Sequence, residues 1–140
     1  MNSSEARQPA NDWPLFGFRL LVALLIGVHG WYRLLHNGSP VFGEWLAGEG
    51  VPLPYVVAWG VTCAEILGSA CLALGLYVRP FAALFMAVYS MGIVLVHAPE
   101  GWFVVGAGRN GMEYSVLLIG SLAVLALRVR APLWRALPPR

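Results

Sequence analysis

The sequence predicts an all-α fold: a bundle of four antiparallel transmembrane helices, with a short interfacial helix in the first outward loop. Of the 140 residues, 59% are hydrophobic and 11% are charged, whereas a soluble domain usually carries about 25% charged residues. The apolar residues gather in four stretches, each near the ~20 residues that cross a hydrocarbon core of about 30 Å. We expect the four helices at about 14–36, 55–77, 80–98 and 112–130.

Little of the chain lies outside these helices. We expect a single transmembrane domain, 14–130, flanked by two cytoplasmic tails, 1–13 and 131–140, with no separate soluble domain. The first apolar stretch follows a segment without a basic cluster and lacks a small-residue cleavage site. The first helix is therefore expected to be retained as a signal anchor.

Arginine placement predicts the orientation, because the chain has no lysine. Seven arginines flank the helix ends on the side of both termini, and only Arg33 and Arg109 lie on the other side. By the positive-inside rule both termini are cytoplasmic, and loops 36–54 and 98–111 face outward. This pattern suits a bacterial inner membrane, and the arginine excess requires no nucleic-acid partner.

Local signals define the first two elements. Pro14 suits the first turn of the first transmembrane helix. In the outward loop, Ser39 as N-cap and Pro40 at the first helical position predict a short helix over 40–47. Its apolar face and Trp45 indicate that it lies in the membrane interface.

The second to fourth transmembrane helices carry further signals. Gly60, Ala64 and Gly68 recur every four residues in the second helix, and such a stripe of small residues lets another backbone approach closely. The short turn 77–80, which ends in proline, predicts that the second and third helices form an antiparallel hairpin. The fourth helix is expected to begin at Met112.

Glu65 is the most informative residue, since it is the only charged one between Val51 and Val78. A charge near the bilayer midplane costs roughly 2.5–3.5 kcal/mol on insertion scales. A chain that keeps such a group must neutralise it, pair it or use it. Because Glu65 neighbours the stripe of small residues, we expect it to face protein.

In the predicted topology, every transmembrane helix brings an ionisable group to the outer half. His29 and Arg33 lie on one face of the first helix, four residues apart. Arg33 either pairs with Glu65 or Glu113 or anchors the helix at the interface. His97 either takes part in function or caps helix carbonyls. Glu113 either pairs with an arginine or interacts with the helix dipole.

These residues can serve several kinds of chemistry. A quinone head group needs a donor at each carbonyl and a proton route, which His, Arg and Glu side chains supply. Haem and metal sites are disfavoured, because the two membrane histidines lie at different depths and no Glu-x-x-His motif is present. The candidate catalytic residues are Glu65, His29 and Arg33. The candidates for binding a cofactor, a quinone or a partner are His97, Arg109, Glu113 and Tyr114.

Four groups of residues carry a resemblance to a known family. They are His29-Gly30 followed by Arg33, the run 65–68 leading into 72–79, His97 before 101–103, and Gly-Met-Glu-Tyr at 111–114. In this order they resemble the DoxX family of small bacterial four-helix membrane proteins, over about residues 16–127. Arg33 stands where the family commonly has lysine, and Ser69 where it has a second glycine.

The resemblance implies a similarity to a small subunit of thiosulfate:quinone oxidoreductase, and other members of the family are tied to redox and oxidative-stress systems. It marks the functional positions as Glu65, Arg33, His29, His97 and Glu113. The first hypothesis is a quinone-interacting subunit of a membrane oxidoreductase. The alternatives are a non-catalytic membrane anchor or assembly partner, and a small-solute or proton pathway. Besides lipid, the expected partner is another protein or a second copy of the chain.

Overall fold

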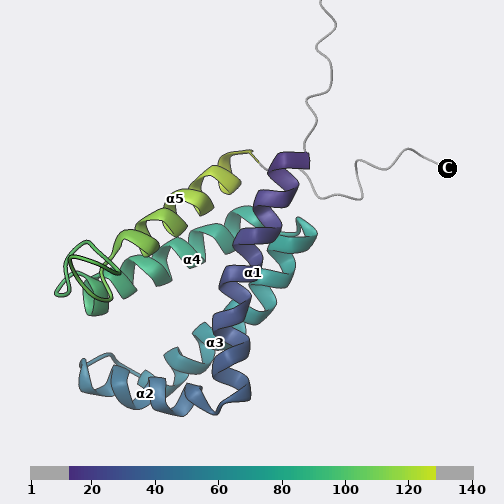
Figure 1. Ribbon diagram of the computed structural model, residues 1–140. Coiled ribbons are helices and arrows are strands. Elements are labelled where there is room, and N and C mark those ends of the chain that lie inside the picture. The colour runs from purple at the N-terminus through teal and green to yellow at the C-terminus, as the bar shows by residue number, and fades with distance from the viewer. Residues whose placement is uncertain (1–12, 129–140) are drawn as a thin grey trace, which may run out of the picture.

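The computed structural model describes residues 13–128, and every regular element in this range is helical (Figure 1). The elements are α1 (Trp13–Leu35), α2 (Gly38–Gly48), α3 (Pro54–Leu74), α4 (Val78–Gly92), the π-helix η1 (Ile93–His97) and α5 (Glu113–Arg128). Helix α4 and η1 together cover the single predicted helix 80–98, and α5 is described as far as Arg128. With these two taken as one, the observed bounds differ from the predicted ones by at most three residues. The predicted tails lie outside the described residues, except that Trp13 opens α1.

Three segments in this range are long and apolar enough to cross a membrane: α1, α3, and α4 together with η1. Helix α5 has 16 residues, which is just short of the roughly 17–25 residues that span a bilayer. The helical fold class is confirmed. The predicted bundle of four spans is supported for three helices, because the described part of the fourth is too short to count as a span by length alone.

Different segments of the chain lie at the two ends of the molecule. Figure 1 shows that α1 begins, and α5 ends, near the turn between α3 and α4, and we call this side the terminal end. Helix α2 and the loop between η1 and α5 lie on the other side, which we call the loop end. Apolar side chains from α1, α3, α4 and α5 form one core; its largest fully buried members are Phe85, Ile26, Leu72, Leu122 and Leu125.

Helices α1 and α3 pack together closely because α1 presents glycines to α3. A Cβ atom added at Gly30 would lie 2.9 Å from Cβ of Glu65 and 3.0 Å from the carbonyl oxygen of Thr62. One added at Gly27 would lie 2.9 Å from Oγ of Ser69. The glycines that allow this approach are therefore those of α1.

The stripe of small residues predicted in α3 behaves differently. Gly60 is exposed, and an added Cβ there would meet nothing within 4 Å. Gly68 receives the rings of Phe81 and Phe85 rather than a neighbouring backbone. The prediction of a backbone contact along this stripe was wrong, because α1 approaches the adjacent face of α3.

Helix α2 is present where the interfacial helix is predicted, but it begins earlier. Its N-cap position is Asn37, which has a left-handed backbone and makes no side-chain cap. Ser39, the predicted N-cap, lies inside the helix and is buried, and its hydroxyl group turns to α3. Gly43 packs directly on the ring of Tyr55, so that α2 rests on the first turns of α3.

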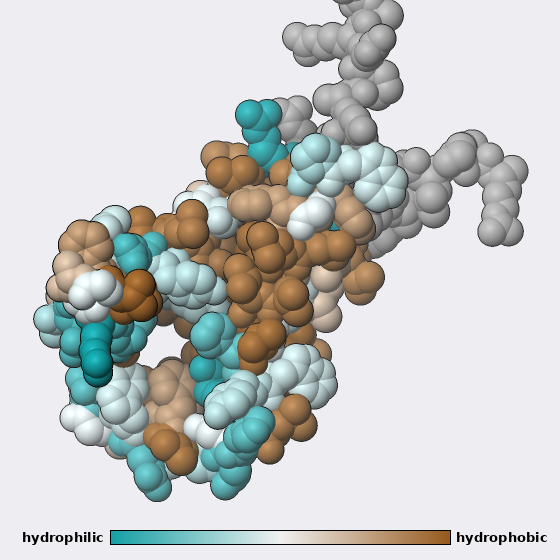
Figure 2. Space-filling model, viewed as in Figure 1, coloured by the Kyte–Doolittle hydropathy of each residue, from teal (hydrophilic) through white to brown (hydrophobic). Residues whose placement is uncertain are grey.

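Helices α4 and α5 run side by side as a hairpin. Towards the terminal end, α4 packs on α3 through Phe81 and Phe85, whose rings meet Gly68. Met86 and Tyr89 still pack against the core, but beyond Phe85 no residue of α4 or η1 is fully buried. Figure 1 shows the hairpin diverging from α1 and α3 towards the loop end. Figure 2 shows an opening at the loop end, between the loop that follows η1 and the region of α2.

Replacing Gly30 by alanine tests the contact between α1 and α3. Gly30→Ala should lower the free energy of unfolding by about 1–3 kcal/mol, the usual cost of overpacking. The matched control is Gly17→Ala in the same helix, where an added Cβ meets nothing within 4 Å. It should be neutral or stabilising by up to about 1 kcal/mol. The measurement is unfolding by SDS titration in micelles, and equal effects of the two substitutions would contradict the packing described.

Candidate functional site

Glu65 lies in the middle of α3 and is enclosed by protein, with 2% of its surface exposed. Its carboxylate oxygen Oε2 accepts a hydrogen bond from Nη2 of Arg33, and the two side chains form a salt bridge between α3 and α1. This is the only ion pair among residues 13–128. The structure thus gives Glu65 the partner that its place in an apolar helix requires.

Arg33 is held on three sides. Its Nε donates to Oγ1 of Thr62 at 3.2 Å, and Nη2 donates to Glu65. The guanidinium group also lies over the ring of Phe42 in α2, with Cζ 5.1 Å from the ring centroid, a favourable cation–π arrangement. The side chain is 20% exposed, and Nη1 has no hydrogen-bond partner among the residues that the structure describes.

The hydroxyl group of Thr62 fixes the position of Arg33. Thr62 donates its hydrogen to the carbonyl oxygen of Ala58 at 2.8 Å. Because a hydroxyl group has one hydrogen and two acceptor positions, Thr62 must act as acceptor for its other two partners. These are Arg33 and the hydroxyl group of Ser39, at 3.0 Å. All the hydrogen-bonding positions of Thr62 are therefore filled.

Tyr89 of α4 completes a polar cluster, which consists of Tyr89, Glu65, Arg33, Thr62, Ser39 and Phe42. Its hydroxyl group donates to Oε1 of Glu65 at 3.4 Å, which is long for an O–H···O bond. Tyr114 is exposed at the start of α5. Tyr89 stands where α4 parts from α3, so the cluster lies beside the opening.

Among the described residues, the other candidates make no hydrogen bond or ion pair with the Glu65 carboxylate. His29 is exposed on α1, one turn before Arg33. Nδ1 of His97 lies 2.7 Å from the carbonyl oxygen of Asn110, and Oε1 of Glu113 accepts from the backbone N–H of Val104 at 3.0 Å. These two side chains shape the loop between η1 and α5. Arg109 is exposed in the same loop.

Four residues of the cluster were not among the sequence candidates: Ser39, Phe42, Thr62 and Tyr89. Hydroxyl and aromatic side chains are common in membrane helices and cost little there, so nothing in the sequence singles them out. The spacing offers one signal in retrospect. Thr62 and Glu65 are three residues apart and so share one face of α3, which makes Thr62 a natural partner for whatever binds Glu65.

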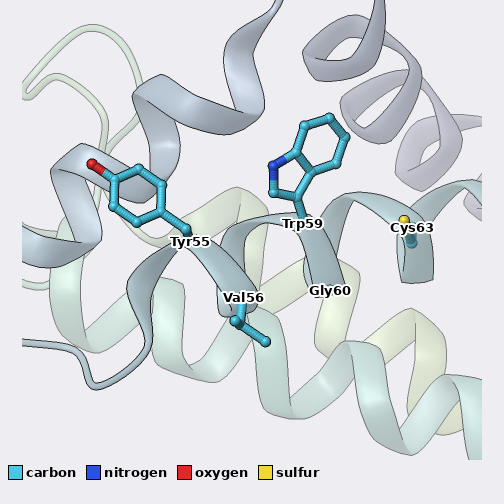
Figure 3. A pocket seen from close by; sticks show the side chains of 5 residues that line it. All are labelled: Tyr55, Val56, Trp59, Gly60 and Cys63. Atoms are coloured by element: carbon cyan, nitrogen blue, oxygen red, sulfur yellow. The ribbon is translucent and has the colours of Figure 1, made fainter.

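Two surface hollows lie elsewhere. An open groove of about 480 Å³ on α3 is lined by Tyr55, Val56, Trp59, Gly60 and Cys63, and Figure 3 shows the rings of Tyr55 and Trp59 rising from the same side of the helix. A second hollow of about 440 Å³ is formed by loop residues 104–109, which include Arg109. Within residues 13–128, no three His, Cys, Asp or Glu side chains gather as a metal site would require.

The cluster has a definite electrostatic character. A salt bridge between apolar helices is little screened by water, so its charges interact strongly while each depends on the other for compensation. Arg33 retains donor capacity at Nη1, and Glu65 retains acceptor capacity at Oε1. A donor and an acceptor thus lie side by side in an apolar setting, which can bind a small ligand that has both kinds of group.

A double-mutant cycle tests the salt bridge. Arg33→Met leaves a buried carboxylate without its partner and should cost roughly 3–5 kcal/mol of unfolding free energy. Arg33→Met combined with Glu65→Leu removes both charges and should cost much less than the sum of the two single substitutions. The measurement is unfolding in micelles, with Arg128→Met at the exposed end of α5 as control. Additive effects would show that the two side chains do not interact.

Ser39 allows a separate test of how α2 is held. Ser39→Ala removes a buried donor to Thr62 and should cost about 1 kcal/mol. Ser121→Ala is the control, since its hydroxyl group bonds only to its own helix, at Leu117, and should change stability by less than about 0.5 kcal/mol. If Ser39→Ala were equally neutral in thermal unfolding, α2 would not depend on this bond.

Comparison with known proteins places the chain in a family. The model of the DoxX family matches residues 15–98, which is more than half of the chain. Neither a curated protein nor a solved structure matches it. The matched range runs from the first turn of α1 past the end of η1, and it contains Arg33, Thr62, Glu65 and Tyr89. On this match and its apolar helices, the chain belongs to the DoxX family of membrane proteins.

Proposed function

We propose that this protein is a redox-linked membrane subunit that binds the head group of a quinone beside Arg33, Glu65 and Tyr89. One observation supports the proposal most strongly. A salt bridge is buried between apolar helices next to the point where α4 parts from α3, and one nitrogen of its arginine has no partner in the described part of the chain. Ligand sites commonly combine apolar walls with a few convergent polar groups of this kind.

The donors of the cluster suit a quinone ring. Each quinone carbonyl oxygen accepts hydrogen bonds, and Nη1 of Arg33 supplies a charged donor, the stronger kind. The hydroxyl group of Tyr89, with its long bond to Glu65, is a second donor that can turn to a ligand. The apolar helix surfaces around the cluster suit the hydrocarbon tail, which favours a membrane-embedded site over a water-filled one.

Each residue has a distinct part in this proposal. A bound quinone supplies the two-electron chemistry, and the electrons come from a partner oxidoreductase docked on the outward loops. Arg33 binds the ring oxygen, and Glu65 and Thr62 hold Arg33 in position. His29, exposed one turn away on α1, exchanges protons with the surroundings. His97, Glu113 and Arg109 shape and charge the loop that the partner contacts.

The proposal includes a topology. Both termini are cytoplasmic in a bacterial inner membrane, as the arginine placement predicts, and α5 acts as the fourth span. The packing of α5 supports this, because Leu118, Leu122 and Leu125 are all buried in the common core while the rest of the helix is largely apolar.

A non-catalytic assembly role is the second candidate, and the same cluster supports it in a different way. Its hydrogen bonds join α1, α2, α3 and α4. In some proteins a buried polar group is kept because it specifies one arrangement of helices. In that case Glu65→Gln would reduce stability or recovery of a partner, and no quinone would bind.

Photolabelling of the full chain in lipid nanodiscs distinguishes the quinone-binding role from the assembly role. A photoactivatable azidoquinone should label residues of α1, α3 or α4 around the cluster, as located by peptide mass spectrometry. Glu65→Gln should reduce this labelling about tenfold or more, because Arg33 loses the charged hydrogen bond that positions it. The matched control, Glu44→Gln, makes the same chemical change on the exposed side of α2 and should label like the unmodified protein.

Label scattered evenly over the exposed apolar surfaces would contradict the quinone site. So would full labelling of the cluster in a Glu65→Gln protein that is folded by circular dichroism. Loss of stability in Glu65→Gln without any site-specific label in the unmodified protein would favour the assembly role.

A further inference from the structure

The two buried acceptors of the cluster differ in how completely they are satisfied. Thr62 uses its one hydrogen and both of its acceptor positions. The Glu65 carboxylate has about four acceptor positions, but it has two partners: Arg33 at Oε2 and Tyr89 at Oε1. The bond to Tyr89 is 3.4 Å long, so Oε1 is the weakly satisfied atom. A buried carboxylate oxygen in this condition attracts a further donor.

We propose that the site selects the reduced, hydroxyl-bearing form of the ring: a quinol, with one hydroxyl group donating to Oε1 of Glu65. This inference rests on the proposed function, since it concerns the same site, and it adds which redox form binds more tightly. The oxidised ring has only acceptor oxygens, and it can therefore use Arg33 but not Glu65.

One ring oxygen can contact both Arg33 and Glu65, because their charged groups lie next to each other. The Arg33–Glu65 salt bridge places the carboxylate beside the guanidinium group. A phenolic hydroxyl group can accept from Nη1 of Arg33 and donate to Oε1 of Glu65 at the same time, because it has both a hydrogen and lone pairs. A quinone carbonyl oxygen has no hydrogen to donate, so in the same place its lone pairs are repelled by those of Oε1. A site that holds a ligand hydroxyl group in this way discriminates strongly against an analogue without it.

Tyr89 already donates a hydrogen bond to Oε1 of Glu65. It therefore affects how strongly the site prefers the quinol over the quinone. Its hydroxyl group is the weak donor that a quinol hydroxyl group supplements or displaces. Tyr89→Phe removes this donor and keeps the ring, leaving Oε1 without a partner in the unliganded protein. The quinol should then bind more tightly, by about threefold, whereas binding of the oxidised ring should not improve.

The experiment measures competition against azidoquinone labelling of the full chain in nanodiscs under nitrogen. Three competitors share one ring and one tail: decylubiquinone, decylubiquinol and the dimethyl ether of that quinol, which has the quinol's oxygens without its hydrogens. Decylubiquinol should compete about tenfold or more better than either of the others, as expected for one charge-assisted hydrogen bond. The dimethyl ether separates the effect of the donor from that of ring shape.

Two pairs of variants assign the effect to Oε1. At an azidoquinone concentration raised until site-specific labelling of Glu65→Gln can be measured, the three competitors should come within about threefold of one another on this variant, whereas Glu44→Gln should keep the full preference. If Glu65→Gln fails to fold, Tyr89→Phe still tests the inference, because its preference for the quinol must rise above that of the unmodified protein. Tyr77→Phe, on the exposed turn before α4, is its matched control and should leave the preference unchanged.

The outcomes separate the two proposals. Equal competition by all three compounds, with site-specific labelling intact, would overturn the selection of the quinol and leave the quinone site standing. A preference that neither Glu65→Gln nor Tyr89→Phe alters would overturn it too, because the donor would then meet another group. Absence of site-specific labelling in the unmodified protein would overturn the proposed function and, with it, this inference.

Discussion

The salt bridge between Arg33 and Glu65 is the constraint on which the rest of the structure depends. A carboxylate in the middle of an apolar helix is costly unless a cation and further donors compensate it. The compensation here comes from α1, and it requires the backbone of α1 to lie very near α3. Gly30 makes this approach possible, because a Cβ atom in its place would clash with Cβ of Glu65. The ion pair and the glycine contact are thus two parts of one arrangement.

The same requirement explains the position of α2. Arg33 needs more than one partner to stay in place, and α2 supplies Phe42 beneath the guanidinium group while Ser39 completes the hydrogen bonds of Thr62. On the other side, the bond from Tyr89 to Glu65 links α4 to the cluster at the point where the hairpin of α4 and α5 leaves the rest of the molecule. The polar cluster is therefore well fixed by α1, α2 and α3 and loosely closed by α4, an asymmetry that suits a site that must admit a ligand.

Much of this could be predicted from the sequence, for physical reasons that differ between residues. The helices are readable because apolar stretches of membrane length leave few alternatives, and Glu65 stands out because a charge is rare there. Thr62, Ser39 and Tyr89 were missed because hydroxyl groups are ordinary in such helices and only their partners make them significant. Ser39 was misread as an N-cap because capping depends on backbone angles, and the left-handed residue is Asn37. The parting of α4 from α3 follows from tertiary packing, which no local pattern records.

The most direct test of the account is the ionisation state of Glu65 in a lipid bilayer, measured by infrared difference spectroscopy of the unmodified protein and Glu65→Gln in nanodiscs near neutral pH. The account predicts that the band lost on substitution is that of an ionised carboxylate, because the group is one half of a salt bridge with Arg33. A lost band with the carbonyl stretch of a protonated carboxylic acid would contradict it. Glu65 would then be a neutral donor, and neither the ion pair nor the acceptor position at Oε1 would exist.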